Sequence, residues 1–207
     1  MSSGLRIGRL PAVPALDRPD LLAAPVVSFL ESWPRADDVG VAEIDPDLAD
    51  TAAFCEAYDV LPAASANCVI VAGRRGDVTT MAACMVLATT RADVNGVVRR
   101  RLDARKASFA AMDVAVAETG MEYGGITPIG LPADWPILVD AAVVAAGDVV
   151  IGSGVRRSKL VLPGKALGDL PGAEVIDGLA ARVSQPAPTR SASDREGTRS
   201  RTPKRGG

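Results

Sequence analysis

The most informative stretch of the sequence is a glycine- and proline-rich segment that predicts a structured loop, Gly124-Gly125-Ile126-Thr127-Pro128-Ile129-Gly130-Leu131-Pro132. Adjacent glycines adopt backbone angles closed to other residues, so the chain can turn sharply there and keep its amide groups accessible. Pro128 and Pro132 fix their own φ angles and favour extended backbone at the preceding residues, which makes the loop rigid. A rigid row of N–H donors is what an acyl-transfer enzyme uses where a carbonyl oxygen gains charge. The same residues also suit an ordinary structured turn, so the segment alone leaves both interpretations open.

Length and composition predict one folded domain with short tails. The chain has 207 residues, of which 48% are hydrophobic and 3% aromatic, so Val, Leu, Ile and Ala must fill the core. The scarcity of aromatic side chains disfavours the binding of exposed single-stranded bases. No apolar run is long enough to span a membrane and no signal peptide opens the chain, so we expect no membrane contact. Cys55, Cys68 and Cys84 lack paired spacing, which predicts buried free thiols and a cytoplasmic location.

The sequence contains no histidine, and its charge is unevenly distributed. The lack of histidine excludes Ser-His-Asp and Cys-His triads and the commonest catalytic zinc sites. Residues 182–207 hold seven basic and two acidic side chains, whereas residues 1–181 hold 16 basic and 23 acidic ones. An acidic body disfavours broad electrostatic binding of nucleic acid, so phosphate contacts must be local or come from the tail.

Turn signals and apolar periodicity divide the chain into short helices and strands. Residues 1–16 are predicted to be flexible, and residues 182–207 to form a disordered basic tail. Residues 17–181 are predicted to form a single α/β domain, with one mixed or barrel-like sheet flanked by short helices. Helices are expected over residues 21–30 (capped by Asp20), 50–58, 94–102, 112–119 and 166–170, and strands over 39–44, 66–72, 79–88, 106–110, 137–139, 149–152, 159–162 and 173–176.

Five segments in a fixed order carry a resemblance to a known family. They are Ser65-Ala66-Asn67-Cys68-Val69-Ile70-Val71, Arg105-Lys106-Ala107-Ser108-Phe109-Ala110, the loop that begins at Gly124, Ile137-Leu138-Val139-Asp140 and Ile151-Gly152-Ser153-Gly154. Together with the Gly-x-x-x-Pro pattern of the loop, they make residues 40–178 resemble the YbaK/EbsC family of aminoacyl-tRNA editing domains, which is related to the insertion domain of bacterial prolyl-tRNA synthetase. The resemblance implies a trans-editing deacylase that needs no protein nucleophile, metal or cofactor.

Candidate site residues follow from the resemblance, position by position. Those that match the family's catalytic loop, which holds the acyl carbonyl, are Gly124, Gly125, Ile126, Thr127 and Pro128. Those expected to contact the substrate are Asn67, Gly130, Asp140, Ser153, Gly154 and Arg156. Many family members have a lysine where this chain has Asn67, and an amide brings no charge to the site. Arg156 matches a basic residue of the family and is the expected substitute for that charge.

Several alternatives remain open at this stage. Arg99, Arg100 and Arg101 are candidates for tRNA contact, although a charge run on a short helix is more often a solvated face. Asp140 could bind a substrate amine or be a solvated carboxylate at a strand end. The leading functional hypothesis is hydrolysis of mischarged aminoacyl-tRNA. The alternatives are a non-catalytic relative that binds an aminoacyl-nucleotide or small amino-acid-like ligand, and an interaction module that docks on an aminoacyl-tRNA synthetase.

Overall fold

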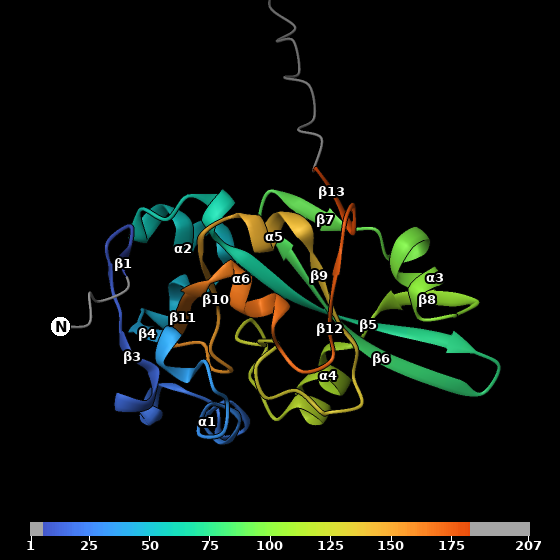
Figure 1. Cartoon of the computed structure of the whole chain (residues 1–207), viewed down its shortest axis with the longest axis horizontal. Coiled ribbons are helices and arrows are strands. Elements are labelled where there is room, and N and C mark those ends of the chain that lie inside the picture. The colour runs from blue at the N-terminus through green and yellow to red at the C-terminus, as the bar shows by residue number, and fades with distance from the viewer. Residues whose placement is uncertain (1–5, 183–207) are drawn as a thin grey trace, which may run out of the picture.

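The structure is a computed structural model that describes residues 6–182 (Figure 1). Its strands are β1 (Arg6–Ile7), β2 (Leu10–Pro11), β3 (Val13–Pro14), β4 (Gly40–Glu43), β5 (Ala66–Arg75), β6 (Val78–Leu87), β7 (Thr90–Ala92), β8 (Lys106–Phe109), β9 (Ile137–Asp140), β10 (Asp148–Gly152), β11 (Ser158–Pro163), β12 (Ala173–Ile176) and β13 (Ala180–Arg182). Its α-helices are α1 (Ala24–Leu30), α2 (Thr51–Tyr58), α3 (Arg99–Arg101), α4 (Met112–Thr119), α5 (Ala141–Ala145) and α6 (Gly164–Gly168).

Two main sheets make up most of the domain. One has four strands in the order β10-β11-β4-β3, and the other has five in the order β12-β9-β6-β5-β8. The long hairpin β5–β6 pairs all ten residues of each strand and turns at Gly76, whose φ of 59° suits a residue without a side chain. In the five-stranded sheet β9 runs parallel to β6 and to β12, whereas the β5 pairings are antiparallel. An isolated parallel bridge between Ser65 and Val150 joins the two sheets.

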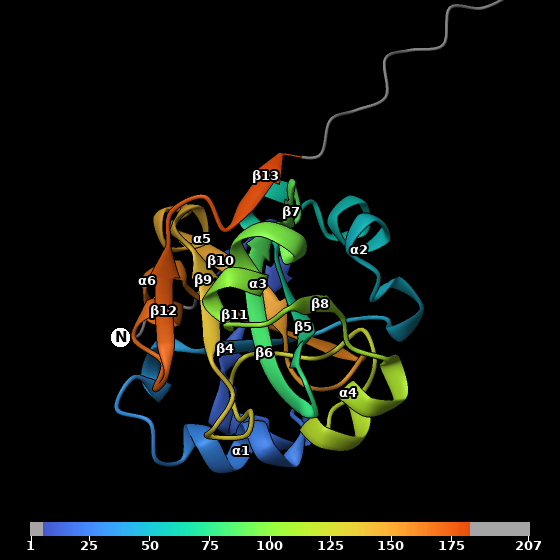
Figure 2. The same ribbon diagram turned by 90° about the vertical axis from the view of Figure 1, so that its right-hand side faces the viewer.

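The strand β5 faces two different cores because its side chains alternate. Ile70 packs into the largest buried cluster, which also takes side chains from α1, β10 and β11. Val71 packs into a smaller cluster with Val98 and Leu138, on the other face of the sheet. Figure 2 shows α3 in front of β6, over this second face. The two faces of β5 therefore have separate environments, one facing the other sheet and one covered by the segment before α3.

The mixed α/β class predicted from the sequence is confirmed, but the expectation of one sheet is wrong. The strands divide between the two main sheets and two short strand pairs, and residues 6–182 contain no closed barrel. Between the two main sheets, β10 and the residue before β5 share the single bridge from Val150 to Ser65 and no ladder. Within the described residues no helix has both the length and the apolar content needed to cross a membrane.

Local differences from the sequence predictions have physical causes. The helix expected from residue 21 begins at Ala24 with Pro25 in its first turn, and Asp20 pairs with Arg18 rather than capping it. The helix expected over residues 94–102 opens as a π-helical turn, which Asp93 caps through the amides of Gly96 and Val97. The sequence analysis did not identify α5, β7 and β13.

The predictions for the two ends of the chain have different outcomes. Residues 6–14, expected to be flexible, form β1, β2 and β3, because Leu10 is fully buried beside α2. This contact outweighs the Gly- and Pro-rich composition. The predicted basic tail lies almost entirely in residues 183–207, outside the described residues.

Candidate functional site

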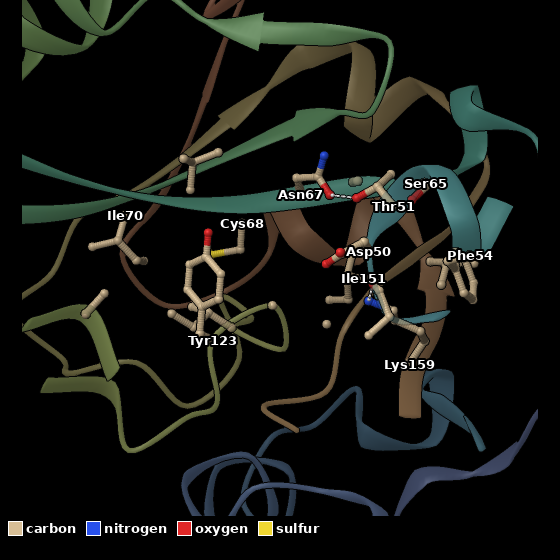
Figure 3. Close-up of a pocket in the computed structure, with 18 of the residues that line it drawn as sticks. Asp50, Thr51, Phe54, Ser65, Asn67, Cys68, Ile70, Tyr123, Ile151 and Lys159 are labelled. Carbon is tan, nitrogen blue, oxygen red and sulfur yellow. Dashed lines mark hydrogen bonds between the residues drawn. The ribbon is translucent and has the colours of Figure 1, made fainter. Parts of the chain in front are cut away.

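A cavity of about 540 Å³ opens where the two sheets meet (Figure 3). Five parts of the chain form its wall: α2, β5, the β8–α4 junction, the loop after α4, and the ends of β10 and β11. At one end lie Asp50, Phe54 and Lys159, and at the other lies Tyr123. The lining residues are Ala49, Asp50, Thr51, Phe54, Ser65, Ala66, Asn67, Cys68, Val69, Ile70, Phe109, Ala110, Met112, Ala115, Tyr123, Gly124, Ile126, Val150, Ile151, Gly152 and Lys159.

The glycine-rich loop is fixed by backbone contacts with the turn after β10. The amide of Glu122 donates to the carbonyl of Gly154 (2.8 Å), and the amide of Gly154 donates to the carbonyl of Gly125 (2.7 Å). A Cβ on Gly125 would lie 2.7 Å from the Val155 carbonyl group, and a Cβ on Gly152 would lie 2.3 Å from the Gly125 oxygen. Glycine is therefore needed at positions 125 and 152 because two backbones pass at contact distance.

Within this loop, two of the five predicted catalytic residues reach the cavity. Gly124 and Ile126 line it, and neither amide donates a hydrogen bond within residues 6–182. The Gly125 amide donates to the Glu122 carbonyl (2.9 Å), so it is already engaged. Thr127 is fully buried behind the surface, with no hydrogen-bond partner for its hydroxyl among the described residues, and Pro128 does not line the cavity. The available donors are therefore the amides of residues 124 and 126.

Lys159 is the cation of the cavity, and the sequence analysis missed it. Its side chain comes from β11, is 8% exposed, and donates from Nζ to the Ala49 carbonyl (3.0 Å). The ammonium lies 5.4 Å from the centre of the Phe54 ring. Burial, and after it the nearby Arg156 charge, lowers the pKa of Lys159 below its ordinary value of 10.5. The available signal was a lysine inside an apolar strand, followed by Leu160, since a core strand rarely carries a charge.

Asn67 borders the cavity but points its side chain away from Lys159 and Tyr123 (Figure 3). Its Oδ1 accepts a hydrogen bond from the Thr51 hydroxyl (2.9 Å). The residue also lines a second cavity of about 530 Å³ on the other side of α2, beside Glu56. The amide at position 67 therefore ties β5 to α2.

Most of the remaining predicted substrate contacts lie outside the cavity and have structural roles. Asp140 accepts from the amides of Ala142 (2.8 Å) and Ala180 (2.7 Å), so it caps α5 and is not a solvated carboxylate. The Ser153 hydroxyl meets the Ser158 hydroxyl at 2.7 Å in a fully buried position. Gly130 and Gly154 allow close packing, since a Cβ at either would lie 2.4 Å from α1 or the residue before it. None of these four residues lines the cavity, so their contact with a substrate stays a prediction.

Arg156 lies beside the cavity and holds its loops together. Its amide donates to the Glu122 carboxylate (2.6 Å), and its guanidinium donates to the carbonyls of Tyr123 (3.4 Å) and Pro46 (3.2 Å). Asp50 lies 3.8 Å from the same guanidinium, and its carboxylate is 81% exposed. Arg156 therefore adds positive charge near Lys159 while its donors contact the protein itself.

The predicted tRNA-contacting arginines lie on a different face from the cavity. Arg99, Arg100 and Arg101 form α3, which follows the π-helical turn whose Val98 packs on the far face of β5. Arg99 donates to the Asn95 carbonyl (2.7 Å), and Arg101 pairs with Glu174. A tRNA end in the cavity would reach them only by passing around the sheet edge, so their contact with tRNA stays a prediction.

Three large side chains at the cavity mouth are more than half exposed: Phe109 at 53%, Met112 at 56% and Tyr123 at 59%. All three line the cavity, which gives its opening an apolar rim.

In the interior of the cavity, Cys68 is a free thiol, and burial raises its pKa well above the ordinary value of 9.0. The thiolate form is therefore suppressed, and this residue is a poor nucleophile.

Comparisons with known proteins bear on the family and on the fold of this chain. The family described as the aminoacyl-tRNA editing domain matches residues 45–170. A candidate trans-editing enzyme for prolyl tRNA synthetase aligns over 75% of this chain and 94% of its own, with 21% identity and a TM-score of 0.64. A hypothetical protein, APE2540, aligns over 76% of this chain and 99% of its own, with 18% identity and a TM-score of 0.66. These two likenesses show the fold. No curated protein sequence is detectably similar.

Proposed function

Because the chain belongs to the aminoacyl-tRNA editing domain family, we propose that it acts in trans to hydrolyse the ester between a wrong amino acid and the 3′ end of tRNA. The observation that carries the proposal is the pair of unengaged amides, Gly124 and Ile126, on the wall of a half-open cavity. The cavity is the size of a small-molecule site and offers an apolar interior for an amino-acid side chain.

The reaction needs few groups from the protein. A water molecule adds to the ester carbonyl, and the carbonyl oxygen gains negative charge, which the amides of residues 124 and 126 stabilise. The bond from carbon to the ribose 3′ oxygen then breaks, and that oxygen takes the proton lost by the water. The substrate's own amine or the neighbouring ribose hydroxyl relays the proton, since no histidine exists in this chain. The products are a free amino acid and an uncharged tRNA.

The choice of tRNA follows from the structural relative. That relative is named as a trans-editing enzyme for prolyl tRNA synthetase, so tRNA charged by this synthetase is the first substrate to test. A protein with this activity would work in the cytoplasm, where charged tRNA is used. The synthetase itself is the natural protein partner, because released mischarged tRNA must be intercepted before it is consumed.

The test is a deacylation panel of mischarged tRNAs with two matched variants. Ile126→Pro removes the amide hydrogen, and Ile126→Val keeps it while trimming one methylene from the side chain. We expect Ile126→Pro to lower the rate by about 100-fold or more, as for loss of one oxyanion donor, and Ile126→Val to stay near wild type. Equal rates for wild type and a folded Ile126→Pro protein would remove the loop from the mechanism.

A second candidate function is binding without turnover of an aminoacyl-nucleotide or small amino-acid-like ligand. It is favoured by Asn67, which lacks the charge that the resemblance leads one to expect and engages Thr51 instead. The same panel separates the two functions, because a binding protein would retain every mischarged tRNA intact while still binding its acylated end.

A further inference from the structure

Lys159 is an unusual feature of the cavity because its charge is buried without an acidic partner. Its side chain is 8% exposed, and it forms no ion pair within residues 6–182. Its one hydrogen bond goes to the neutral carbonyl of Ala49. A buried ammonium costs several kcal/mol when no anion compensates it, so the fold would gain by placing an apolar residue here. An anionic ligand that enters the cavity would remove this penalty.

The charges around Lys159 favour an anion from outside the protein. Arg156 adds a second positive charge close by, and the Phe54 ring offers only its weakly negative face. Asp50 is the one carboxylate that lines this end, and it is 81% exposed, so solvent screens it. The Cys55 thiol is protonated, because burial raises its pKa. Among the residues that line the cavity, Lys159 therefore has only the exposed Asp50 carboxylate as a possible counter-charge.

The position of Lys159 indicates which part of the substrate it meets. In Figure 3, Lys159 and Tyr123 lie on opposite sides of the cavity, and Tyr123 directly precedes the loop that offers the free amides. If those amides hold the ester carbonyl, the ammonium must meet another group of the acylated RNA end. Phosphate is the only full anion there, and a lysine binds it as a point charge.

We propose that Lys159 binds the phosphate of the 3′-terminal nucleotide, and that this chain therefore carries its substrate-binding cation on β11 rather than at Asn67 on β5. The proposal rests on the proposed function only for the identity of the ligand as an acylated RNA end. It explains how Asn67 can be uncharged in a working site. It also assigns the side chain of residue 67 to the contact between β5 and α2.

The experiment is a binding cycle that needs no turnover. The probe is an RNA minihelix whose 3′ end carries alanine through a stable amide, compared with the same RNA bearing a neutral methylphosphonate at the last linkage. Both are titrated against wild type, Lys159→Met and the control Lys165→Met, which removes an exposed lysine of α6 outside the cavity. Thermal unfolding is measured for each protein.

We expect Lys159→Met to weaken binding of the phosphate RNA by about 10- to 100-fold, the range of a charge-assisted hydrogen bond, and to unfold at the same or a higher temperature. The RNA with the methylphosphonate at its last linkage should bind wild type as weakly as the phosphate RNA binds Lys159→Met. Combining the methylphosphonate with Lys159→Met should weaken binding no further. Lys165→Met should match wild type. If the methylphosphonate binds wild type unchanged, or the two losses simply add, Lys159 does not contact this phosphate.

Lys159→Gln serves as the second variant. It removes the charge but keeps a donor for Ala49, so it reports on binding if Lys159→Met does not fold. Failure of both variants to fold would assign Lys159 to the structure and overturn the proposal. The deacylation panel answers a separate question: binding that depends on Lys159 with no hydrolysis of any mischarged tRNA would retain this proposal and reject the enzymatic function.

Discussion

The two walls of the cavity are built in different ways. The wall beside Tyr123 is made of backbone, and its shape depends on Gly125 and Gly152, where two chain segments touch without side chains between them. The wall beside α2 is made of side chains, and its chemistry depends on Lys159 and Asn67, which come from strands of different sheets. The backbone wall presents hydrogen-bond donors at fixed positions, whereas the side-chain wall presents charge.

This difference has a consequence for how substitutions act. A change in the backbone wall displaces donors and alters the rate of reaction, because the geometry of an oxyanion site leaves little tolerance. A change in the side-chain wall alters which ligand binds and how strongly, since charge and hydrogen bonding set affinity there. We expect the two walls to be separable in measurements of rate and of binding.

Gly152→Ala is the change with the largest expected effect. The new Cβ would lie 2.3 Å from the Gly125 oxygen and 2.6 Å from the Ile126 oxygen, so the loop must move away. We expect deacylation to fall by about 100-fold, with a loss of about 1–3 kcal/mol in the free energy of unfolding from overpacking. The control is Gly168→Ala in α6, whose Cβ would meet the movable side chains of Val175 (3.1 Å) and Val144 (3.6 Å) and no backbone. Rates near wild type for Gly152→Ala would show that the two loops are not in contact in solution.

Gly125→Val is for the same reason a poor probe of the oxyanion hypothesis. The valine would collide with the Val155 backbone, and the amide it disturbs already donates to Glu122. A loss of activity there would report damage to the loop contact and not the removal of a catalytic donor. Ile126→Pro is the informative change on this wall.

The side-chain wall should make the free energy of unfolding depend on pH, through Lys159. Lys159 has a lowered pKa in the folded protein and an ordinary value of 10.5 when unfolded. Between those two values the unfolded chain binds a proton that the folded chain does not, so stability rises with pH across that window. The unfolding free energy of Lys159→Met minus that of wild type should be largest at neutral pH and shrink toward pH 10.5. A difference that does not vary with pH would show that burial leaves this lysine unaffected.

The affinity for RNA should fall with rising pH, whereas the stability of the folded protein rises. Only the protonated amine attracts phosphate, so affinity for the stable alanyl-amide RNA should fall as pH rises through the lowered pKa of Lys159. We expect a drop of about 10-fold in wild type, and a flat profile in Lys159→Met.

Arg156 connects the two walls, and its removal should have a moderate effect. Arg156→Ala loses the guanidinium bonds to Tyr123 and Pro46, which are long, so we expect a cost of about 1 kcal/mol and a several-fold slower reaction. Because Arg156 also lowers the pKa of Lys159, its loss should move the midpoint of the binding profile to higher pH. Arg157→Ala is the control, since that side chain donates to Asp20 outside the cavity. An unmoved midpoint would contradict the electrostatic coupling.

The backbone wall could be predicted from sequence and the side-chain wall could not. The glycines at 124 and 125, followed by Pro128, indicate a sharp rigid loop from local rules alone, and Gly120 ends α4 as the helix rules require. Which loop amides are free depends on Glu122 and Gly154, which contact the loop only after folding. The role of Lys159 depends on how β11 packs beside α2, and no local pattern specifies that contact.

The role of Asp140 also depends on structure that local sequence rules did not predict. A carboxylate after an apolar strand suits either a substrate amine or a helix cap, and the choice depends on whether a helix follows. The five-residue helix α5 was not expected from the sequence, so its cap was not recognised. Both hydrogen-bond donors to Asp140, the amides of Ala142 and Ala180, lie on elements that the sequence analysis did not identify.

Asn67→Lys has the smallest expected effect and tests the comparison most directly. If the cavity lacked a cation, this change would raise affinity for the RNA end. Because Lys159 already supplies the charge, we expect affinity to change by less than about threefold. The side chain of residue 67 points away from Lys159, so a lysine there would extend toward α2 and the second cavity beside Glu56. Loss of the Thr51 hydrogen bond should cost about 1 kcal/mol of stability, which Asn67→Ala measures on its own.

The decisive version places Asn67→Lys in the Lys159→Met protein. If the two strand positions deliver charge to the same point, the double variant should regain the affinity that Lys159→Met lost. We expect it to remain at least about 10-fold weaker than wild type, because the side chain of residue 67 points away from Lys159 and toward α2. Full recovery would show that the cavity accepts its cation from either wall, and that the direction of the Asn67 side chain in this structure does not restrict a longer residue.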